Sequence, residues 1–128
     1  MKKIITLLLI IASFSVAQAQ KQTDDGWRKW EATKCYANIE YRMKYVGKNG
    51  EQHHWQVQFK NNYNSIVSFN YHVTDKLQEY NITTHRKTLY AQKLSEAIDV
   101  YTTEEDIYLF VDKASLSPYP ENFLDCDH

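Results

Sequence analysis

The stretch FKNNYNSIVSFNYHV, residues 59–73, decides the fold of this chain. Apolar side chains occupy every second position on both sides of an asparagine-rich corner, and a period of two is typical of half-buried strands. These apolar positions are Phe59, Val67, Phe69, Tyr71 and Val73. The corner, residues 61–65, joins two strands either as a hairpin within one sheet or as an arch between two sheets. In an arch, the apolar residues would face each other across the core.

Two upstream runs, residues 35–45 and 53–60, alternate in the same way and place their odd-numbered residues inward. A three-residue loop, 48–50, keeps both apolar faces on the same side, because a one-residue slip would expose the whole face. This register pairs Met43 with Trp55, and it places Gly50 where such a loop needs a left-handed residue.

Shorter elements follow downstream. Residues 82–90 are rich in Thr and charge, which predicts an edge strand protected from other chains. Residues 91–98 are either one or two helical turns or a loop. We expect short strands at 99–102 and 107–112, and an extended segment over 115–128 that crosses the fold.

The first residues have the pattern of a secretory signal peptide. Lys2 and Lys3 precede an apolar run, residues 4–16, and a small-x-small cleavage site at residues 17–19. The apolar run is shorter than the roughly 20 residues of a bilayer-spanning helix. We expect cleavage after Ala19 and export to the periplasm or beyond. The cleavage site carries no cysteine, so we do not expect a lipoprotein or membrane insertion.

Cleavage would leave 109 of the 128 residues, with 13 Lys and Arg against 16 Asp and Glu and a formal charge of −3. That length fits one domain. We expect residues 1–19 to be the signal peptide, 20–33 a polar lead-in and 34–128 the folded domain. The weak charge, without a basic cluster, argues against nucleic acid and anionic membrane surfaces as partners.

The two cysteines, Cys35 and Cys126, lie near the two ends of the expected domain. In an oxidising compartment an isolated pair of this kind favours a structural disulfide. A redox-active pair would instead place its cysteines two residues apart beside a helix N-terminus. We therefore expect a staple that joins the two ends of the domain.

Six or seven short strands with little helix predict a single antiparallel β-sandwich, an all-β fold. The order of strand, asparagine-rich corner and strand in WQVQFKNNYNSIVSFNYHV resembles the strand pairs of immunoglobulin-like and fibronectin-type-III-like domains. The resemblance covers roughly residues 35–112 and implies an immunoglobulin-like sandwich of the kind found in small exported bacterial proteins. The staple departs from the immunoglobulin pattern, in which a disulfide joins the two sheets beside a buried Trp. No functional residue is carried over.

No catalytic or cofactor motif stands out. The sequence lacks a G-x-S-x-G elbow and Gly-rich phosphate loops. His53 and His54 are neighbours in a strand, so their side chains point to opposite faces and do not reach one metal ion. Carboxylates such as Asp99 and Asp112 offer many pairs with no distinctive spacing. We therefore expect a non-catalytic protein without a metal or another cofactor.

Aromatic residues exceed the ordinary share, with 17 remaining after the expected cleavage. Trp27, Trp30 and Tyr63 lie outside the inward pattern, and they are the candidate ligand contacts, because exposed rings beside amides suit a sugar or a protein partner. The alternative for the two tryptophans is a plug over the open end of the sandwich near Cys35. We expect a binding or cell-envelope module whose partner is a protein or a cell-surface glycan. A small secreted enzyme or enzyme inhibitor is the remaining alternative.

Overall fold

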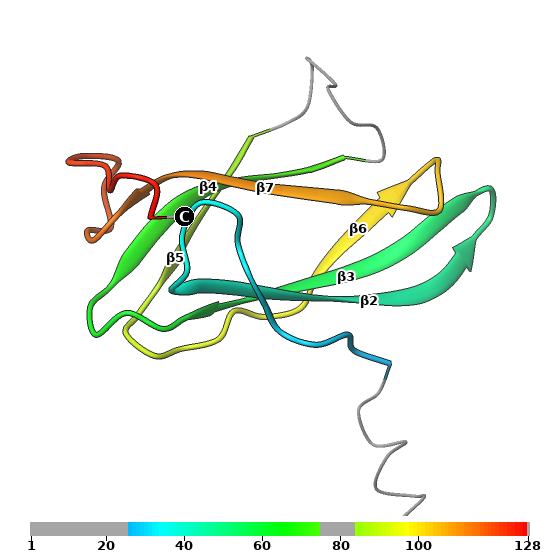
Figure 1. The fold of residues 1–128 in the computed structure, drawn as a ribbon. Helices are drawn as coiled ribbons and strands as arrows, with labels where there is room; N and C mark the ends of the chain where they lie inside the picture. Colours follow the sequence, from blue (N-terminus) through cyan, green and yellow to red (C-terminus); the bar gives the residue numbers. More distant parts are fainter. Residues whose placement is uncertain (1–25, 75–83, 128) are drawn as a thin grey trace, which may run out of the picture.

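The computed structural model describes residues 26–74 and 84–127, so the expected signal peptide lies outside the described residues. The described chain forms two antiparallel sheets that pack as an all-β sandwich, as the sequence predicted (Figure 1). One sheet has the order β1-β2-β3-β6 and the other the order β5-β4-β7. The strands are β1 (Glu31–Ala32), β2 (Ile39–Asn49), β3 (Gln52–Asn61), β4 (Val67–Thr74), β5 (His85–Leu89), β6 (Ile98–Thr102) and β7 (Tyr108–Ser115).

The hairpin between β2 and β3 corrects the predicted register. Its turn has two residues rather than three, and Met43 pairs with Val57 rather than with Trp55. A bulge at Val46 compensates for the even-length turn, because one extra residue on β2 returns the odd positions of both strands to one face. Gly50 has the left-handed φ of 65° that was expected in this turn. The alternation thus predicted the faces correctly and the partners wrongly.

The corner after β3 is an arch, because β3 and β4 belong to different sheets. It brings the rings of Phe59 and Phe69 into contact across the core, edge to face, with centroids 5.1 Å apart. Such an arrangement is favoured between aromatic rings and adds to the gain from burying them. Of the two connections that the sequence left open, the chain uses the one that closes the sandwich.

Asn61 fixes the shape of this arch from the inside, since its side chain is fully buried. Its Nδ2 donates hydrogen bonds to the carbonyl oxygens of Ser65, Leu89 and Tyr90 at 2.9, 3.2 and 3.0 Å. Its Oδ1 accepts a hydrogen bond from the backbone N–H of Tyr63 at 2.8 Å. A buried amide needs such partners, so this Asn ties the arch to the end of β5.

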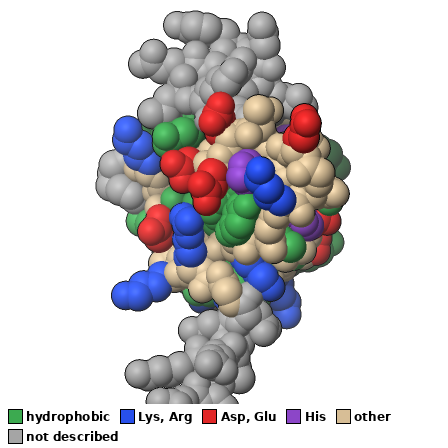
Figure 2. Space-filling model, turned by 90° about the vertical axis from the view of Figure 1, so that its right-hand side faces the viewer, with side chains coloured by type: hydrophobic (Ala, Val, Ile, Leu, Met, Phe, Trp, Pro, Cys, Tyr) green, Lys and Arg blue, Asp and Glu red, His purple; other side chains and the backbone are tan. Residues whose placement is uncertain are grey.

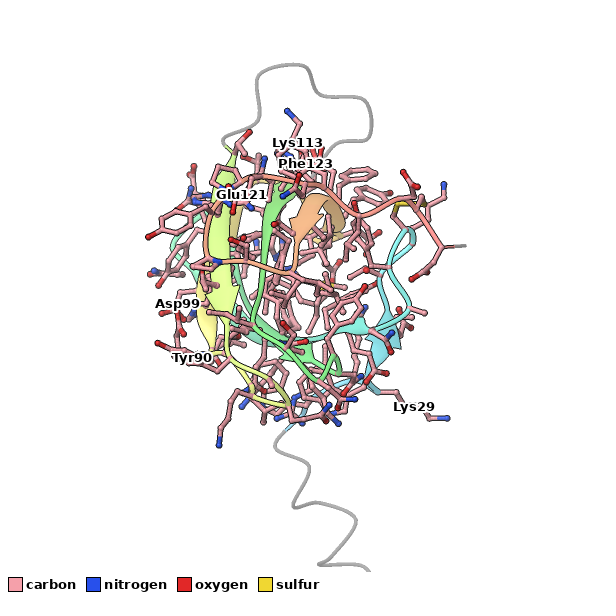
Figure 3. The ribbon with its side chains drawn as sticks, turned by 90° about the vertical axis from the view of Figure 1, so that its left-hand side faces the viewer. Lys29, Tyr90, Asp99, Lys113, Glu121 and Phe123 are labelled. Carbon is pink, nitrogen blue, oxygen red and sulfur yellow. A yellow bond between two sulfur atoms is a disulfide. The ribbon has the colours of Figure 1, made fainter. Side chains whose placement is uncertain are left out.

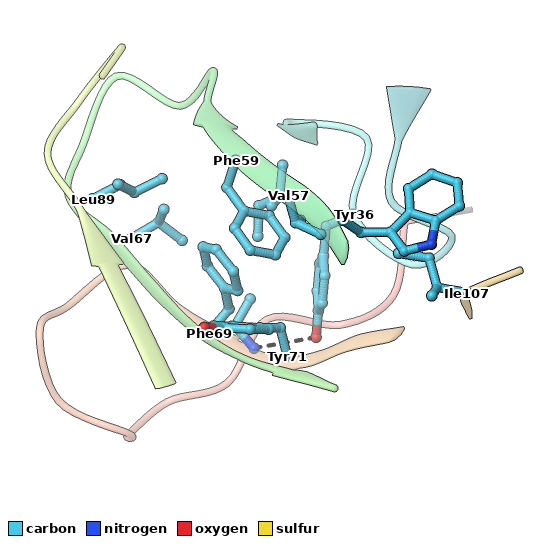
Figure 4. Packing of buried hydrophobic residues seen from close by; sticks show 11 residues of the cluster. Tyr36, Val57, Phe59, Val67, Phe69, Tyr71, Leu89 and Ile107 are labelled. Carbon is cyan, nitrogen blue, oxygen red and sulfur yellow. Dashed lines mark hydrogen bonds between the residues drawn. The ribbon is translucent and has the colours of Figure 1, made fainter. Parts of the chain in front are cut away.

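The core between the sheets is built from the inward residues of both (Figure 4). Tyr36, which lies before β2 and outside the predicted inward pattern, is also buried. Its hydroxyl accepts a hydrogen bond from the backbone N–H of Ala114 at 3.3 Å. The buried hydrophobic residues are Tyr36, Ile39, Trp55, Val57, Phe59, Val67, Phe69, Tyr71, Leu89, Ile107 and Ala114.

The predicted disulfide between Cys35 and Cys126 is present, with the Cα atoms 4.6 Å apart across a sequence separation of 91. Backbone hydrogen bonds support it on both sides. Leu124 N–H donates to the Ala114 carbonyl at 2.7 Å, and Asp127 N–H donates to the Cys35 carbonyl at 2.8 Å. The C-terminal segment is therefore fastened along the end of β7 and to the loop before β2.

The chain between residues 84 and 115, for which the sequence pattern was weaker, forms irregular structure and short strands. Residues 91–97 contain no helix and cross from β5 to the four-stranded sheet, where Leu94 bridges to Lys60 on β3. β5 is an edge strand, and β6 and β7 occupy the two stretches expected to be strands. β1 forms within the expected lead-in. No helix in residues 26–74 and 84–127 is long and apolar enough to cross a membrane.

Candidate functional site

The segment before β1 runs along the edge of β2 and brings the two candidate tryptophans onto the sheet. Arg28 N–H donates to the Met43 carbonyl at 2.9 Å, and Glu31 pairs with Tyr41. The Tyr41 hydroxyl also donates to the Glu31 carboxylate at 2.9 Å. These contacts hold the segment in register, so that Trp27 lies against the outer face of the four-stranded sheet.

Five side chains on this outer face form alternating cation–aromatic contacts, which we call the ladder. The guanidinium of Arg42 lies over both indoles, 4.5 Å from the Trp27 ring centroid and 4.7 Å from that of Trp30. Lys44 Nζ lies 5.9 Å from the Trp27 centroid, and Lys60 Nζ lies 5.7 Å from the Trp30 centroid. All four contacts are within the range of cation–π attraction.

Strand geometry explains how the sequence builds the ladder. Arg42 and Lys44 are two residues apart on β2 and therefore share the outer face. Lys60 on β3 pairs with Glu40, one row before Arg42, and it lies on the same face. The alternation predicted this polar face, but it gave no sign that a segment upstream of β1 would lay indoles between its cations. A W-x-x-W spacing before a strand with alternating cations is the signal that could have found it.

Of the nitrogens of the Arg42 side chain, only Nε has a hydrogen-bond partner among the described residues. Its Nε donates to Gln58 Oε1 at 2.9 Å, and Gln58 Nε2 in turn donates to the Ser95 carbonyl at 2.9 Å. Its terminal nitrogens have no hydrogen-bond partner among residues 26–74 and 84–127. The guanidinium is thus oriented by a side chain and two rings, while its terminal N–H groups stay available.

A hollow of about 210 Å³ opens beside the ladder and is lined by Trp27, Arg28, Lys29, Trp30 and Arg42. The Lys29 side chain projects outward from the molecule (Figure 3). These side chains carry guanidinium, ammonium and indole N–H donors and no acceptor. The Arg28 guanidinium lies over the buried Trp55 ring, 4.8 Å from its centroid, so the donors that the lining offers are those of Lys29, Arg42 and the two indoles. No carboxylate of the described residues lies within 4.0 Å of the charged groups of Arg28, Lys29 or Arg42. The hollow is therefore a positively charged group of donors.

The end of the molecule away from the arch carries both signs of charge. The loop between β6 and β7 contributes Glu104, Glu105 and Asp106. Figure 2 shows acidic and basic side chains intermingled at this end. The ladder differs from it, because its cations lie beside aromatic rings.

The third candidate contact, Tyr63, is not part of the ladder. It lies in the arch and packs, partly buried, against the core cluster. Burial raises the pKa of its hydroxyl, and the nearby Asp127 carboxylate adds to that shift. The structure therefore brings together Trp27 and Trp30 and leaves Tyr63 apart from them.

Two of the histidines, His54 and His72, are each paired with one carboxylate. His54 Nε2 lies 2.8 Å from Asp99 Oδ1, and the pKa of Asp99 is lowered by this hydrogen bond and by a second one from Gln56. His72 Nε2 lies 3.5 Å from Asp112 Oδ1 on the other sheet. No group of three or more His, Cys, Asp or Glu side chains within the described ranges is arranged to hold a metal ion.

The chain matches no protein-family profile, no curated protein and no solved structure.

Proposed function

We propose that this protein is an exported, non-catalytic β-sandwich that acts as a binding module, and that the ladder with its hollow is the contact surface. The observation that carries the proposal is the Arg42 guanidinium, which lies over the rings of Trp27 and Trp30 with its terminal nitrogens unused by described residues. Trp and Arg are the residue types enriched at the energetic centres of interfaces.

The ladder also bears on the kind of contact. A sugar ring that stacks on an aromatic side chain needs a free ring face, whereas cations lie over Trp27 and Trp30. This favours a partner recognised by charge and hydrogen bonds over a neutral glycan stacked on exposed indoles. The described lining of the hollow offers donors and no carboxylate, which supports binding rather than acid–base catalysis.

Export is supported by the signal-like N-terminus and by the disulfide, since such bonds persist in oxidising compartments. We take the resemblance to immunoglobulin-like domains as one of architecture. A constant-type immunoglobulin domain places its first, second, fifth and fourth strands in one sheet. Here the first sheet has the order β1-β2-β3-β6, so the chain connections differ.

The test is co-sedimentation of the chain without residues 1–19 with envelope fragments of the producing cell. We expect the Trp30→Ala and Arg42→Ala variants to bind at least tenfold more weakly than the unchanged chain. The matched control is Phe110→Ala, which removes an exposed ring from β7 on the other sheet. Equal retention of all four proteins, each shown to be folded by circular dichroism, would overturn the proposal.

A further inference from the structure

We propose that Arg42 is the receptor for an oxyanionic group, a carboxylate or sulfate, carried by an acidic polysaccharide chain that lies along the ladder. This inference rests on the proposed function, because it takes the ladder face as the contact surface. It adds the chemical class of the ligand and the residue that anchors it.

Arg42 is oriented before any ligand arrives. Its Nε is held by Gln58, and the planes of Trp27 and Trp30 restrict its rotation. The two terminal nitrogens remain as a planar fork, which is the geometry that binds carboxylate, sulfate or phosphate oxygens through two parallel hydrogen bonds. A guanidinium held in this way loses little side-chain entropy on binding, so more of the interaction energy appears as affinity.

The chemistry of the hollow selects the same ligand. Lys29 adds a further cation to its lining, while the Arg28 guanidinium lies over the ring of the buried Trp55. The indole N–H groups of Trp27 and Trp30 have no hydrogen-bond partner among the described residues, whereas the buried Trp55 donates to a backbone carbonyl. A surface composed of donors complements a group composed of acceptors, and oxyanions are such groups.

The two cations beyond the hollow, Lys44 and Lys60, favour a ligand with more than one anionic group. Lys60 and Lys44 lie in the rows on either side of Arg42. Rows two residues apart on a strand are roughly 6.6 to 6.8 Å apart, so the line of three cations spans about 13 Å. Two carboxylates lie on these rows, and both have partners within the protein. Glu40 accepts a hydrogen bond from Asn62. Asp99, on the row of Lys44 and Gln56, accepts one from Gln56 and lies 2.8 Å from His54 Nε2. A chain with repeated anionic groups fits this line better than a single small anion.

Two other polyanions fit less well. An acidic peptide would bring its backbone N–H groups onto a surface that has donors and almost no free acceptors. Single-stranded nucleic acid gains affinity from bases stacked on free aromatic faces, and the Arg42 guanidinium already lies over the rings of both Trp27 and Trp30. Polysaccharide oxygens, with carboxylates or sulfates at regular intervals, meet the donors of this face without such a penalty.

The experiment titrates the chain without residues 1–19 with defined polymers, by calorimetry and tryptophan fluorescence. The probes are polygalacturonate and heparin, with dextran, polyglutamate, a single-stranded oligonucleotide and inorganic sulfate for comparison. We expect at least one acidic polysaccharide to bind tenfold or more tightly than any other probe, and to weaken as salt is added. Stronger binding of polyglutamate, the oligonucleotide or free sulfate would overturn the proposed class.

Arg42→Lys is the decisive variant, because it keeps the charge and removes the planar fork. We expect it to weaken polysaccharide binding about tenfold, because the variant loses one hydrogen bond to a charged group. Lys113→Gln on β7, which removes one exposed positive charge from the other sheet, is expected to bind as the unchanged chain does. Equal binding by Arg42→Lys would overturn the role of Arg42. If envelope binding depends on the ladder while no acidic polysaccharide binds, this inference fails and the proposed function stands.

Discussion

The outer faces of the two sheets each carry an arginine, and the two arginines use their donors differently. On the three-stranded sheet, Arg86 Nη1 donates to Asn70 Oδ1 at 2.8 Å and to a backbone carbonyl of β7 at 3.1 Å, and Nη2 donates to Ser68 Oγ at 2.7 Å. On the four-stranded sheet, Arg42 donates to Gln58 through Nε. Both terminal nitrogens of Arg86 donate within the protein, although its buried Nε has no hydrogen-bond partner, whereas the terminal nitrogens of Arg42 have no hydrogen-bond partner among the described residues.

What covers each face explains the difference. Ser68 Oγ donates to the carbonyl of Ser117 at 2.6 Å, so the C-terminal segment closes over the three-stranded sheet. Ser68 and Ser115 are consequently buried, and burial lowers the pKa of Arg86. The segment before β1 covers the other sheet with indoles and cations, and it leaves a hollow. A polar face closed by the protein's own backbone stabilises the fold, whereas one left with free donors is suited to binding.

The largest effect is expected from removal of the disulfide that fastens the cover of the three-stranded sheet. Replacing Cys35 and Cys126 together by Ser should lower the free energy of unfolding by about 4 to 5 kcal/mol, because the bond closes a long loop in the unfolded chain. Urea denaturation of the variant and of the oxidised protein measures the difference. Coincident denaturation midpoints would show that the backbone hydrogen bonds of the C-terminal segment hold it without the bond.

Arg86→Met tests the closed face directly. The change should lower the free energy of unfolding by about 2 to 3 kcal/mol, because Ser68 and Asn70 lose a charged donor where water has little access. Envelope binding of the folded variant should be unchanged. Thr88→Val, at an exposed position on the same strand, is the control for stability. A loss of binding in Arg86→Met would place part of the contact surface on the three-stranded sheet.

Arg42→Met should give the reverse pattern. Its two ring contacts are each worth about 0.5 to 1 kcal/mol at a partly exposed site, so stability should fall by about 1 kcal/mol. Binding should fall at least tenfold. The comparison of Arg42→Met with Arg86→Met in the same two assays separates recognition from structure. Similar losses in both assays for both variants would mean that the two faces do not differ in role.

The sequence was informative where burial imposes a period of two. The alternation at Val67, Phe69 and Tyr71 predicted a buried strand face, and all three are buried. It could not separate hairpin from arch, because both connections keep odd positions inward. It also missed the bulge at Val46, since a bulge adds one residue without changing the apolar pattern on either side.

The sequence predicted the two tryptophans of the candidate site, but it did not predict which side chains they contact. Trp27 and Trp30 were chosen because they lie outside the inward pattern, and no local pattern shows which surface such residues meet. The cations that contact the indoles come from β2 and β3. Lys60, on β3, is distant in sequence from Trp30, which it contacts. Tyr36 was missed as a core residue because it lies in a loop, where alternation does not apply.

The smallest effect is expected from the pairing of β1 with β2, which positions the ladder, and it is measured by changing the pH. Burial, together with the hydrogen bond to Glu31 and the charge of that carboxylate, raises the pKa of Tyr41 to about 12. Because the folded state favours the neutral phenol, the stability gained from it is present below pH 10 and is lost as the pH rises from 10 towards 12.

Tyrosinate absorbance of the unchanged chain minus that of Tyr41→Phe isolates this titration. We expect the difference to appear near the upper end of that range, and Glu31→Gln to move it to lower pH, because the variant removes the carboxylate that raises the pKa of Tyr41. The tryptophan fluorescence of the ladder should change over the same pH interval, since Glu31 and Tyr41 pair the segment carrying Trp30 to β2. A fluorescence change that precedes the titration of Tyr41 would mean that the ladder is held by its own cation–aromatic contacts and not by this edge.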